Sequence, residues 1–417
     1  MRGASGGLTT RGRCLLAAGL AAALCALVLD ERDLLRVAGF LVALPLLATL
    51  AAGRARLGLT AKRRMLPPRT PVGIASEVSL TVRATGRFGT GGLLLEDGVP
   101  AALGARPRFV VERLGRGSEV VLRYPLRPQL RGTHLVGPVV ARITDPFGLA
   151  EFGLELGERH RLVATPVVVP LRGIPSGGGL GAGSDGTGRL HSGQGEDDVV
   201  VRSYRQGDDL RKVAWRATAR YDELMVRVEE RPWRGGTAVL LDHRAAAHRG
   251  HGRSASFECA VSLAASVCLH LQRHGQRVAL TTGDGQVLAG AREVGDHSAD
   301  AVLDALAALT PTHQRGLATA PVPAGGGDLV AILGAVTPDT VEALLRDRPR
   351  RGRNHAVLLD VGAFAPSEGR PAADPHDAAR LLSAAGWSVT VAGPGQPLDS
   401  VWERLCTVPA SRAGAPR

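Results

Sequence analysis

The C-terminal half of the chain begins with a strand–helix–strand pattern that decides its fold: "TAVLLD" at 237–242, "SFECAVSLAASVCLHLQRHG" at 256–275 and "RVALTT" at 277–282. The first and last segments are short apolar runs, and the middle segment has the length and apolar spacing of a helix. The alternation continues, with further strands predicted at 328–334, 355–361 and 387–393. It predicts an α/β domain at 237–417, built on a mainly parallel, doubly wound sheet.

Upstream of this domain the pattern changes to short alternating runs, and Gly or Pro punctuates them about every ten residues. This spacing predicts an antiparallel β-sandwich over 67–172. Within it, "DPFGL" at 145–149 has the Pro and Gly of a tight turn between strands. We interpret the Gly-rich stretch 173–195 as a flexible linker, followed at 196–236 by a separate strand–helix–strand segment.

The first 66 residues contain two uncharged apolar runs, at 14–29 and 37–53. Each is near the lower limit of about 17 residues for crossing a bilayer as a helix. Basic residues precede the first run and follow the second, whereas the connector carries Asp30, Glu31 and Asp33. Since positive flanks stay in the cytoplasm, the sequence predicts a two-span hairpin at 1–66 in the cell membrane, with both termini cytoplasmic.

The composition narrows the function classes. Lys and Arg outnumber Asp and Glu by 51 to 39, which gives a net charge of +12 and is compatible with nucleic acid or an anionic membrane. Aromatic residues are 3% of the chain, few for a protein that stacks on bases, so nucleic acid is not favoured. Lipid association at Lys62, Arg63 and Arg64 remains an alternative. The five cysteines form no C-x-x-C pair, so neither disulfides nor a zinc site is expected.

The most unusual segment is "RSYRQGDDLRKVAWRATAR" at 202–220. Asp208 is suited to cap a helix whose free N–H groups favour a carboxylate. Lys212, Arg216 and Arg220 then recur every four residues and form a cationic ridge on one face. Two interpretations remain open: a structural network of ion pairs, or a binding site for an anion or an acidic partner.

This segment resembles the signature of a bacterial family, the domain of unknown function 58 proteins. The overall plan also resembles the family: two N-terminal spans, a β-rich segment, the signature, and a region similar to a von Willebrand factor A domain. Val213, Thr218 and Ala219 match the signature together with most of the residues that we predict to bind a partner. These predicted binding residues are Arg202, Tyr204, Gly207, Asp208, Arg211, Trp215, Arg216 and Arg220.

The resemblance implies a membrane-anchored accessory protein, often encoded beside a MoxR-type AAA+ ATPase, and supplies no established activity. In metal-binding A domains the first strand ends in Asp-x-Ser-x-Ser, where the carboxylate and hydroxyls hold Mg²⁺. The corresponding stretch here is "DHRAA" at 242–246, so both hydroxyls are lost and Arg244 brings a cation beside Asp242. We therefore expect Asp242 to be a degenerate metal-site position and predict no bound metal or cofactor. A zinc cluster of His243, His248 and His251 is a less favoured alternative.

Three functional hypotheses follow. The leading one is a non-catalytic, membrane-anchored scaffold or adaptor that binds a protein partner, an AAA+ ATPase by family resemblance, in envelope-related processes. The second is an envelope enzyme that uses Asp197, Asp198, Asp208 and Asp209 as acid, base or metal ligands, since paired carboxylates shift one another's pKa. The third is an anionic-lipid-binding basic module. The sequence leaves the partner, the oligomeric state and the question of enzymatic activity open.

Overall fold

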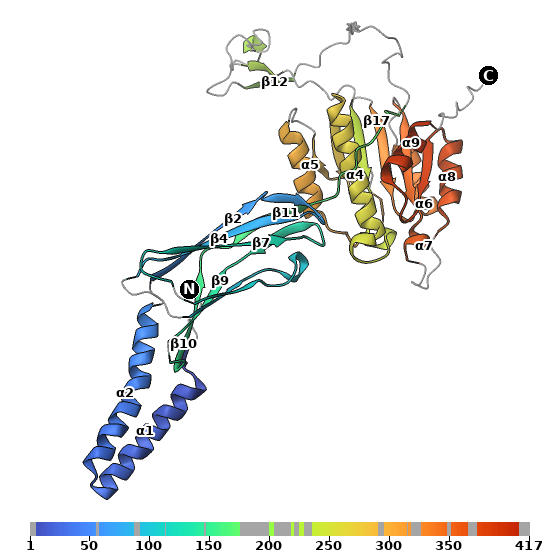
Figure 1. The fold of residues 1–417 in the computed structure, drawn as a ribbon. Coiled ribbons are helices and arrows are strands. Elements are labelled where there is room, and N and C mark those ends of the chain that lie inside the picture. Colours follow the sequence, from blue (N-terminus) through green and yellow to red (C-terminus); the bar gives the residue numbers. More distant parts are fainter. Residues whose placement is uncertain are drawn as a thin grey trace, which may run out of the picture. The chain divides into compact units, whose positions relative to one another are not determined.

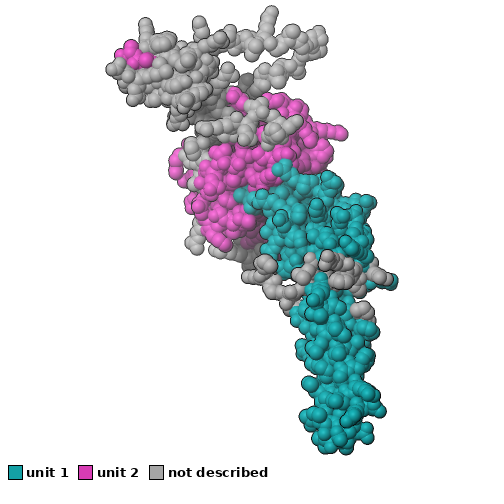
Figure 2. All heavy atoms as spheres, turned by 90° about the vertical axis from the view of Figure 1, so that its left-hand side faces the viewer, with its two compact units in different colours: residues 1–166, 307–309 teal, residues 167–306, 310–417 magenta. Residues whose placement is uncertain are grey.

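The structure is a computed structural model with two compact units, shown in teal and magenta in Figure 2. Unit 1 contains residues 1–166 and 307–309, and unit 2 contains residues 167–306 and 310–417. The residues that the structure describes are 6–55, 58–86, 92–112, 114–145, 147–175, 200–203, 218–220, 225–228, 236–290, 296–314, 316–317, 327–347, 352–365 and 373–407.

Unit 1 begins with two long apolar helices, α1 (Thr10–Leu29) and α2 (Arg32–Ala55), which lie side by side (Figure 1). Both are long and apolar enough to cross a membrane, and only 17% of the most apolar window of each is buried. A 20-residue helix is about 30 Å long, which matches the hydrocarbon core of a bilayer. The predicted pair of apolar N-terminal helices is confirmed, and its exposure is unlike that of a soluble core helix.

A glycine sets the spacing of the helix pair. A Cβ added to Gly19 would lie 2.8 Å from Cγ2 of Val42 and 3.0 Å from Cβ of Leu41. Because even an alanine would clash at these distances, the glycine permits the close approach that apolar helices use to pack in a membrane. At the start of α1, the side chain of Thr9 accepts a hydrogen bond from the amide of Gly12 at 3.2 Å and caps the helix.

The rest of unit 1 is β-rich and contains three sheets (Figure 1). The five-stranded sheet has the order β1 (Gly6–Leu8), β10 (Ala150–Leu156), β9 (Val139–Thr144), β5 (Leu93–Asp97) and β6 (Arg108–Val111). A three-stranded sheet contains β2 (Leu59–Leu66), β4 (Ser76–Ala84) and β7 (Glu119–Leu126). The third contains β3 (Arg69–Pro71), β11 (His160–Thr165) and β8 (Gly132–Val136), where β3 pairs parallel to β11. A 3-10 turn, η2, covers Ala101–Leu103.

The sheets of β4 and of β5 and β9 share one apolar core. Leu80 and Val82 of β4 pack in the same buried cluster as Leu93 and Leu95 of β5 and Ala141 of β9. The burial of β4 alternates along the strand, as expected when one face covers a core. The alternation in the sequence of this strand thus corresponds to one buried and one more exposed face.

Strand β2 changes the interpretation of the basic segment after α2. Residues 59–66, which the sequence assigned to the flank of the hairpin, pair along their length with β4. Lys62 and Arg64 are exposed, but the side chain of Arg63 is buried. Arg63 was therefore wrongly included among the cations available to lipid. Successive side chains of a strand point to opposite faces, so Arg63 points into the β region while Lys62 and Arg64 point away from it.

Arg63 forms a buried ion pair with Asp97. Its Nε donates to Oδ2 of Asp97 at 3.1 Å, and its Nη2 donates to Oδ1. The hydroxyl of Tyr124 also donates to Oδ2, and burial, together with this hydrogen bond, raises the pKa of Tyr124. Arg63 Nη1 donates to the carbonyls of Val136 and Glu158, at 3.0 and 2.9 Å. One guanidinium thus links β2, β5 and β8.

Unit 2 is built on a six-stranded sheet of order β16-β15-β14-β17-β18-β19. Its strands are β14 (Thr237–Leu241), β15 (Val278–Thr282), β16 (Val287–Ala289), β17 (Asp328–Leu333), β18 (Asn354–Leu359) and β19 (Ser388–Ala392). All neighbouring strands pair parallel except β15 and β16. The predicted mainly parallel sheet is confirmed, with one antiparallel strand at its edge. A separate pair, β12 (Val200–Ser203) and β13 (Met225–Val228), is antiparallel.

Helices lie between the strands in the chain. The long ones are α4 (Ser256–Arg273), α5 (Asp296–Ala308), α6 (Pro338–Asp347), α8 (Pro375–Ala384) and α9 (Leu398–Thr407). The short ones are η4 (Ala245–Ala247), η5 (Gly252–Ser254) and α7 (Val361–Phe364).

Both faces of the sheet are covered. Leu344 of α6, Leu382 of α8 and the buried Trp387 share a cluster with alternate strand residues such as Leu240 and Leu358. Helix α4 packs on β14, β15 and β17 (Figure 1), and its residue His270 contacts Trp402 of α9 with ring centroids 6.1 Å apart. This two-sided covering is the doubly wound arrangement.

Residues 167–173 lie along α4 and α9 within unit 2. The carbonyl of Gly173 accepts from Nε1 of Trp402 at 3.1 Å and lies 2.7 Å from Nε2 of His270. The amide of Val169 donates to Oγ of Ser266 at 2.9 Å. The segment that ends the predicted sandwich is therefore fixed to the α/β unit by side chains that sequence patterns do not assign to it.

Removing the Arg63 side chain should destabilise unit 1 strongly. In Arg63→Met the buried carboxylate of Asp97 loses its counter-ion, and such a loss costs about 3–5 kcal/mol. Urea unfolding of the full-length protein in detergent, followed by circular dichroism, measures the change. Arg64→Met on the exposed face of the same strand is the matched control, with an expected change within about 0.5 kcal/mol. Equal stability of the two variants would show that the buried pair is dispensable.

Candidate functional site

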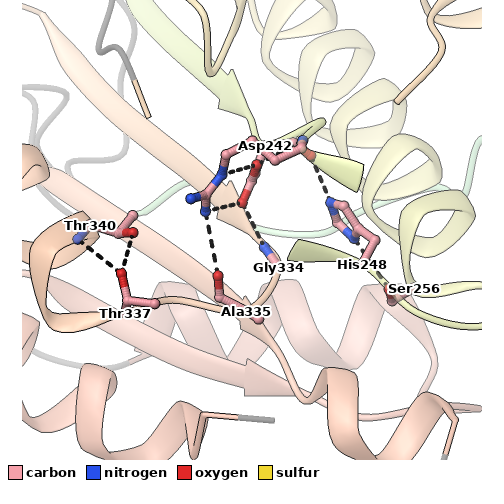
Figure 3. Close-up of polar contacts among 8 residues, drawn as sticks. Asp242, His248, Ser256, Gly334, Ala335, Thr337 and Thr340 are labelled. Carbon is pink, nitrogen blue, oxygen red and sulfur yellow. Dashed lines mark hydrogen bonds and ion pairs between the residues drawn. The ribbon is translucent and has the colours of Figure 1, made fainter. Parts of the chain in front are cut away.

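The strand order of unit 2 creates a switch point at its centre. The chain leaves β14 through α4 toward β15, whereas it leaves β17 through α6 toward β18, on the opposite side. In open α/β sheets, ligands bind beyond the carboxyl ends of two such neighbouring strands. Asp242 directly follows β14, and Gly334 directly follows β17. The candidate site is therefore the edge around Asp242, shown in Figure 3.

Arg244 closes on Asp242 with two parallel hydrogen bonds. Its Nε donates to Oδ1 at 2.9 Å and its Nη2 donates to Oδ2 at 2.8 Å (Figure 3). The amide of Arg244 also donates to Oδ1 at 3.1 Å, and the amide of Gly334 donates to Oδ2 at 3.4 Å. Asp242 is 0% exposed and Arg244 is 6% exposed. Each carboxylate oxygen thus accepts two hydrogen bonds from the chain, and the guanidinium neutralises the carboxylate.

The loop after β14 is fixed on the end of β17. The amide of Ala335 donates to the carbonyl of Ala247 at 2.8 Å, and Nη2 of Arg244 lies 3.4 Å from the carbonyl of Ala335. A Cβ at Gly334 would lie 2.1 Å from the carbonyl oxygen of Ala247, so this close approach requires glycine. The pair of Asp242 and Arg244 therefore has backbone support from both strands.

Two threonines begin α6 beside this loop. The hydroxyls of Thr337 and Thr340 lie 2.9 Å apart, and the amide of Thr340 donates to Oγ1 of Thr337 at 3.4 Å (Figure 3). Thr337 thus acts as the cap of α6, a role that satisfies one of the free amides of the first turn. Both hydroxyls are therefore engaged in hydrogen bonds at the start of α6.

His248 supports Asp242 from the other side. Its Nε2 lies 2.8 Å from the carbonyl of Asp242, and since a carbonyl can only accept, Nε2 carries the proton. Its Nδ1 lies 3.2 Å from Oγ of Ser256 (Figure 3). Burial lowers the pKa of His248, although the charge of Asp242 opposes this shift. The ring is therefore neutral at neutral pH, and both of its nitrogens are engaged within the chain.

His243 lies next to the ion pair, near the carboxyl end of β15. It is 5% exposed, and its Nε2 is 3.8 Å from Oδ2 of Asp284. Among the described residues, its buried Nδ1 has no hydrogen-bond partner. Burial tends to raise the pKa of Asp284, but hydrogen bonds from Thr282 and the amide of Gln286 outweigh it and lower the pKa. Sequence analysis did not single out Asp284, although its position after a parallel strand was a usable signal.

Most of the predicted binding residues cannot be compared with this site. Tyr204, Gly207, Asp208, Arg211, Trp215 and Arg216 lie outside the described residues, as do Asp197, Asp198 and Asp209. Arg202 lies in β12, opposite Val226 of β13, and Arg220 is exposed in the helical turn 218–220. Of the acidic candidates drawn from the sequence, Asp242 is thus the one whose side-chain contacts the structure defines.

Comparison with protein families identifies one segment. Residues 200–323 match the family described as "Protein of unknown function DUF58". The match contains the whole signature segment at 202–220 and also the strand and loop that carry Asp242 and Arg244. The family predicted from the signature is confirmed. Among curated proteins, none matches the chain in sequence.

The comparison with solved structures gives matches to about a quarter of the chain. The CARDB domain of a Pyrococcus furiosus protein, in complex with di-metal ions, is 17% identical, covers 24% of this chain and 87% of its own, and has a TM-score of 0.18. The sporulation control protein Spo0M from Bacillus subtilis is 13% identical, covers 24% of this chain and 48% of its own, and has a TM-score of 0.14. Scores this low support no inference about function.

The site should become metal-dependent when Arg244 is replaced. Arg244→Ser/Ala246→Ser restores the Asp-x-Ser-x-Ser pattern and leaves Asp242 buried without its counter-ion, which costs about 3–5 kcal/mol. We expect millimolar Mg²⁺ or Mn²⁺ to raise the melting temperature of this variant, read from tryptophan fluorescence, and to leave the wild type unchanged. The exposed control Arg253→Ser should behave as the wild type. A wild-type protein stabilised by Mg²⁺ would contradict the assignment of Arg244 as the resident cation.

Unit 2 should lose stability as the pH falls from about 7 to about 5. Burial lowers the pKa of His248, His270 and His355 below the value of 6.5 expected in the unfolded chain. The unfolded chain therefore binds more protons in this window, and protonation favours unfolding. In His248→Gln the pH dependence of the melting temperature should be shallower, while His313→Gln, at an exposed histidine, should keep the wild-type slope. Equal slopes for the two variants would exclude His248 as a contributor.

Proposed function

Since this chain is a DUF58 family member over residues 200–323, and that family carries no assigned activity, we propose that it is a non-catalytic, membrane-anchored scaffold or adaptor. In this proposal the α/β unit binds a protein partner while the N-terminal helices hold it at the membrane. The observation that carries the proposal is the closed pair of Asp242 and Arg244. The position where α/β proteins place their ligand chemistry is filled by the chain's own guanidinium.

The anchor follows from the placement of α1 and α2 within unit 1. Strand β1 precedes α1 and β2 follows α2, and both belong to the β sheets of the same unit. Both ends of the helix pair therefore emerge on one side of any membrane that the pair spans. Arg11, Arg13 and Arg54 are exposed at this end, and by the positive-inside rule these charges support a cytoplasmic location of the β sheets.

A von Willebrand factor A-like fold for 237–417 is part of the proposal. The alternation of strands and helices and the position of Asp242 after the first strand support it. Such a domain with a tethered cation in place of a divalent ion would be insensitive to metal supply. Its binding surface would then not require a bound divalent ion.

The partner that we propose is a MoxR-type AAA+ ATPase, on the grounds of the family resemblance, in envelope-related processes. The proposed docking residues are those of the signature, above all the ridge residues Arg216 and Arg220. Arg220 is exposed, as a docking cation must be. An acidic surface on the partner would complement this ridge and would speed association at low salt.

Affinity capture of the full-length protein from detergent-solubilised native membranes tests the proposal. We expect an AAA+ ATPase to co-purify with the wild type and to be lost from Arg216→Ala/Arg220→Ala. The control Arg116→Ala/Arg123→Ala removes the same charge from exposed positions of unit 1 and should retain the partner. Absence of any stable partner, or equal capture by all three proteins, would overturn the scaffold hypothesis and favour the search for an activity.

A further inference from the structure

The turn between β9 and β10 is attached to the start of α1. The amide of Thr9 donates to the carbonyl of Leu149 at 2.8 Å, and the hydroxyl of Thr9 donates to the carbonyl of Gly148 at 2.7 Å. A Cβ at Gly12 would lie 2.2 Å from the carbonyl oxygen of Leu149. The turn is therefore held against the first turn of the helix, at the level where α1 leaves the β region.

The turn is also rigid in itself. The buried carboxylate of Asp145 accepts a hydrogen bond from the amide of Phe147 at 2.9 Å and another from the amide of Ala150 at 2.6 Å. Leu149 and Ala150 pack in one buried cluster with Ala48 and Ala52 of α2. Because both helices hold the turn, the place of Phe147 relative to the helix pair is defined.

Phe147 lies at the tip of this turn and is 64% exposed. A single exposed apolar side chain is ordinary on a soluble surface. Its position is what distinguishes it, because it lies at the base of two helices whose outer surfaces expose large apolar side chains, among them Leu20 and Phe40. The turn thus lies at the end of a helix pair that exposes apolar side chains.

Two exposed arginines lie at the same end of the helix pair. Arg11 in the first turn of α1 and Arg54 in the last turn of α2 are exposed. Arginines at the ends of spanning helices lie at the headgroups, and interfacial segments bury Phe, Trp and Leu side chains at the adjoining headgroup–acyl boundary. An aromatic ring with flanking guanidinium groups fits the boundary between acyl chains and anionic headgroups.

We propose that the turn 145–149 is a lipid-contacting site, in which the Phe147 ring inserts at the headgroup–acyl boundary of the leaflet that faces the β sheets. The partner is an anionic phospholipid surface. This inference rests on the membrane anchor of the proposed function and adds a third point of membrane contact. It places lipid contact at a different segment from Arg63, whose side chain is buried.

A third contact restricts the motion of the β sheets against the membrane. Attachment at the two helix ends alone would leave the β sheets free to rock about the line that joins these ends. A third membrane contact beside that line limits this motion. Transfer of a Phe side chain from water to an apolar phase is favourable, so insertion of the ring would hold this point of the β region at the bilayer. The turn would therefore orient the cytoplasmic part at a fixed distance from the bilayer.

Quenching of tryptophan by brominated lipid in vesicles of phosphatidylcholine and phosphatidylglycerol tests the proposal on the full-length protein. Phe147→Trp is the test variant. Leu20→Trp in the middle of α1 reports on the anchor. Leu135→Trp in β8, which pairs with β11 at the end of the β region away from the helices (Figure 1), is an exposed control. The wild type supplies the background of the native tryptophans.

We expect lipid brominated near the headgroup to quench the added fluorescence of Phe147→Trp at least about twofold and to leave that of Leu135→Trp unchanged. If Leu20→Trp is quenched by lipid brominated deep in the chain while Phe147→Trp behaves as Leu135→Trp, the anchor stands and the turn proposal is wrong. If Leu20→Trp is unquenched as well, the membrane anchor itself fails, and this inference fails with it.

Discussion

A charge that leaves water needs a counter-ion and hydrogen bonds, and each unit of this chain meets that requirement with one buried arginine–aspartate pair. In unit 1, Arg63 and Asp97 link strands of different sheets through the core. In unit 2, Asp242 and Arg244 close the carboxyl edge of the parallel sheet. Neither pair can lose one member without leaving a buried charge, so the surrounding strands are bound to these two contacts.

The second pair also defines what the α/β unit can do. A buried carboxylate at a switch point would attract a cation, and in this chain the cation is covalently attached two residues later. Its guanidinium is planar and matches both carboxylate oxygens, so the neutralisation is directional and permanent. A site of this kind favours a stable binding surface over a cycle of ligand loading and release, in keeping with the scaffold role proposed for the chain.

The apolar helix pair of unit 1 is held together by a different interaction. Apolar helices need close packing where no water drives them together, and Gly19 provides it. The helices emerge beside a turn fixed by Asp145 and Thr9, so the exposed ring of Phe147 has a defined height. The hydrogen bonds of the turn thereby fix the position of the β sheets of unit 1 relative to the helix pair.

The sequence by itself determined the element types, because apolar period and turn residues are local properties: it predicted the two apolar helices and the parallel sheet, and it singled out Asp242 as a degenerate metal-site position. It also made the loss of the hydroxyl ligands visible. Only the tertiary structure decided that Arg63 faces inward, that Asp284 lies beside His243, and that both oxygens of Asp242 are already engaged. The first two facts depend on contacts between strands far apart in the chain. The third depends on the conformation of the Arg244 side chain and on the amide of Gly334, 92 residues away. Local patterns carry no information on any of these contacts.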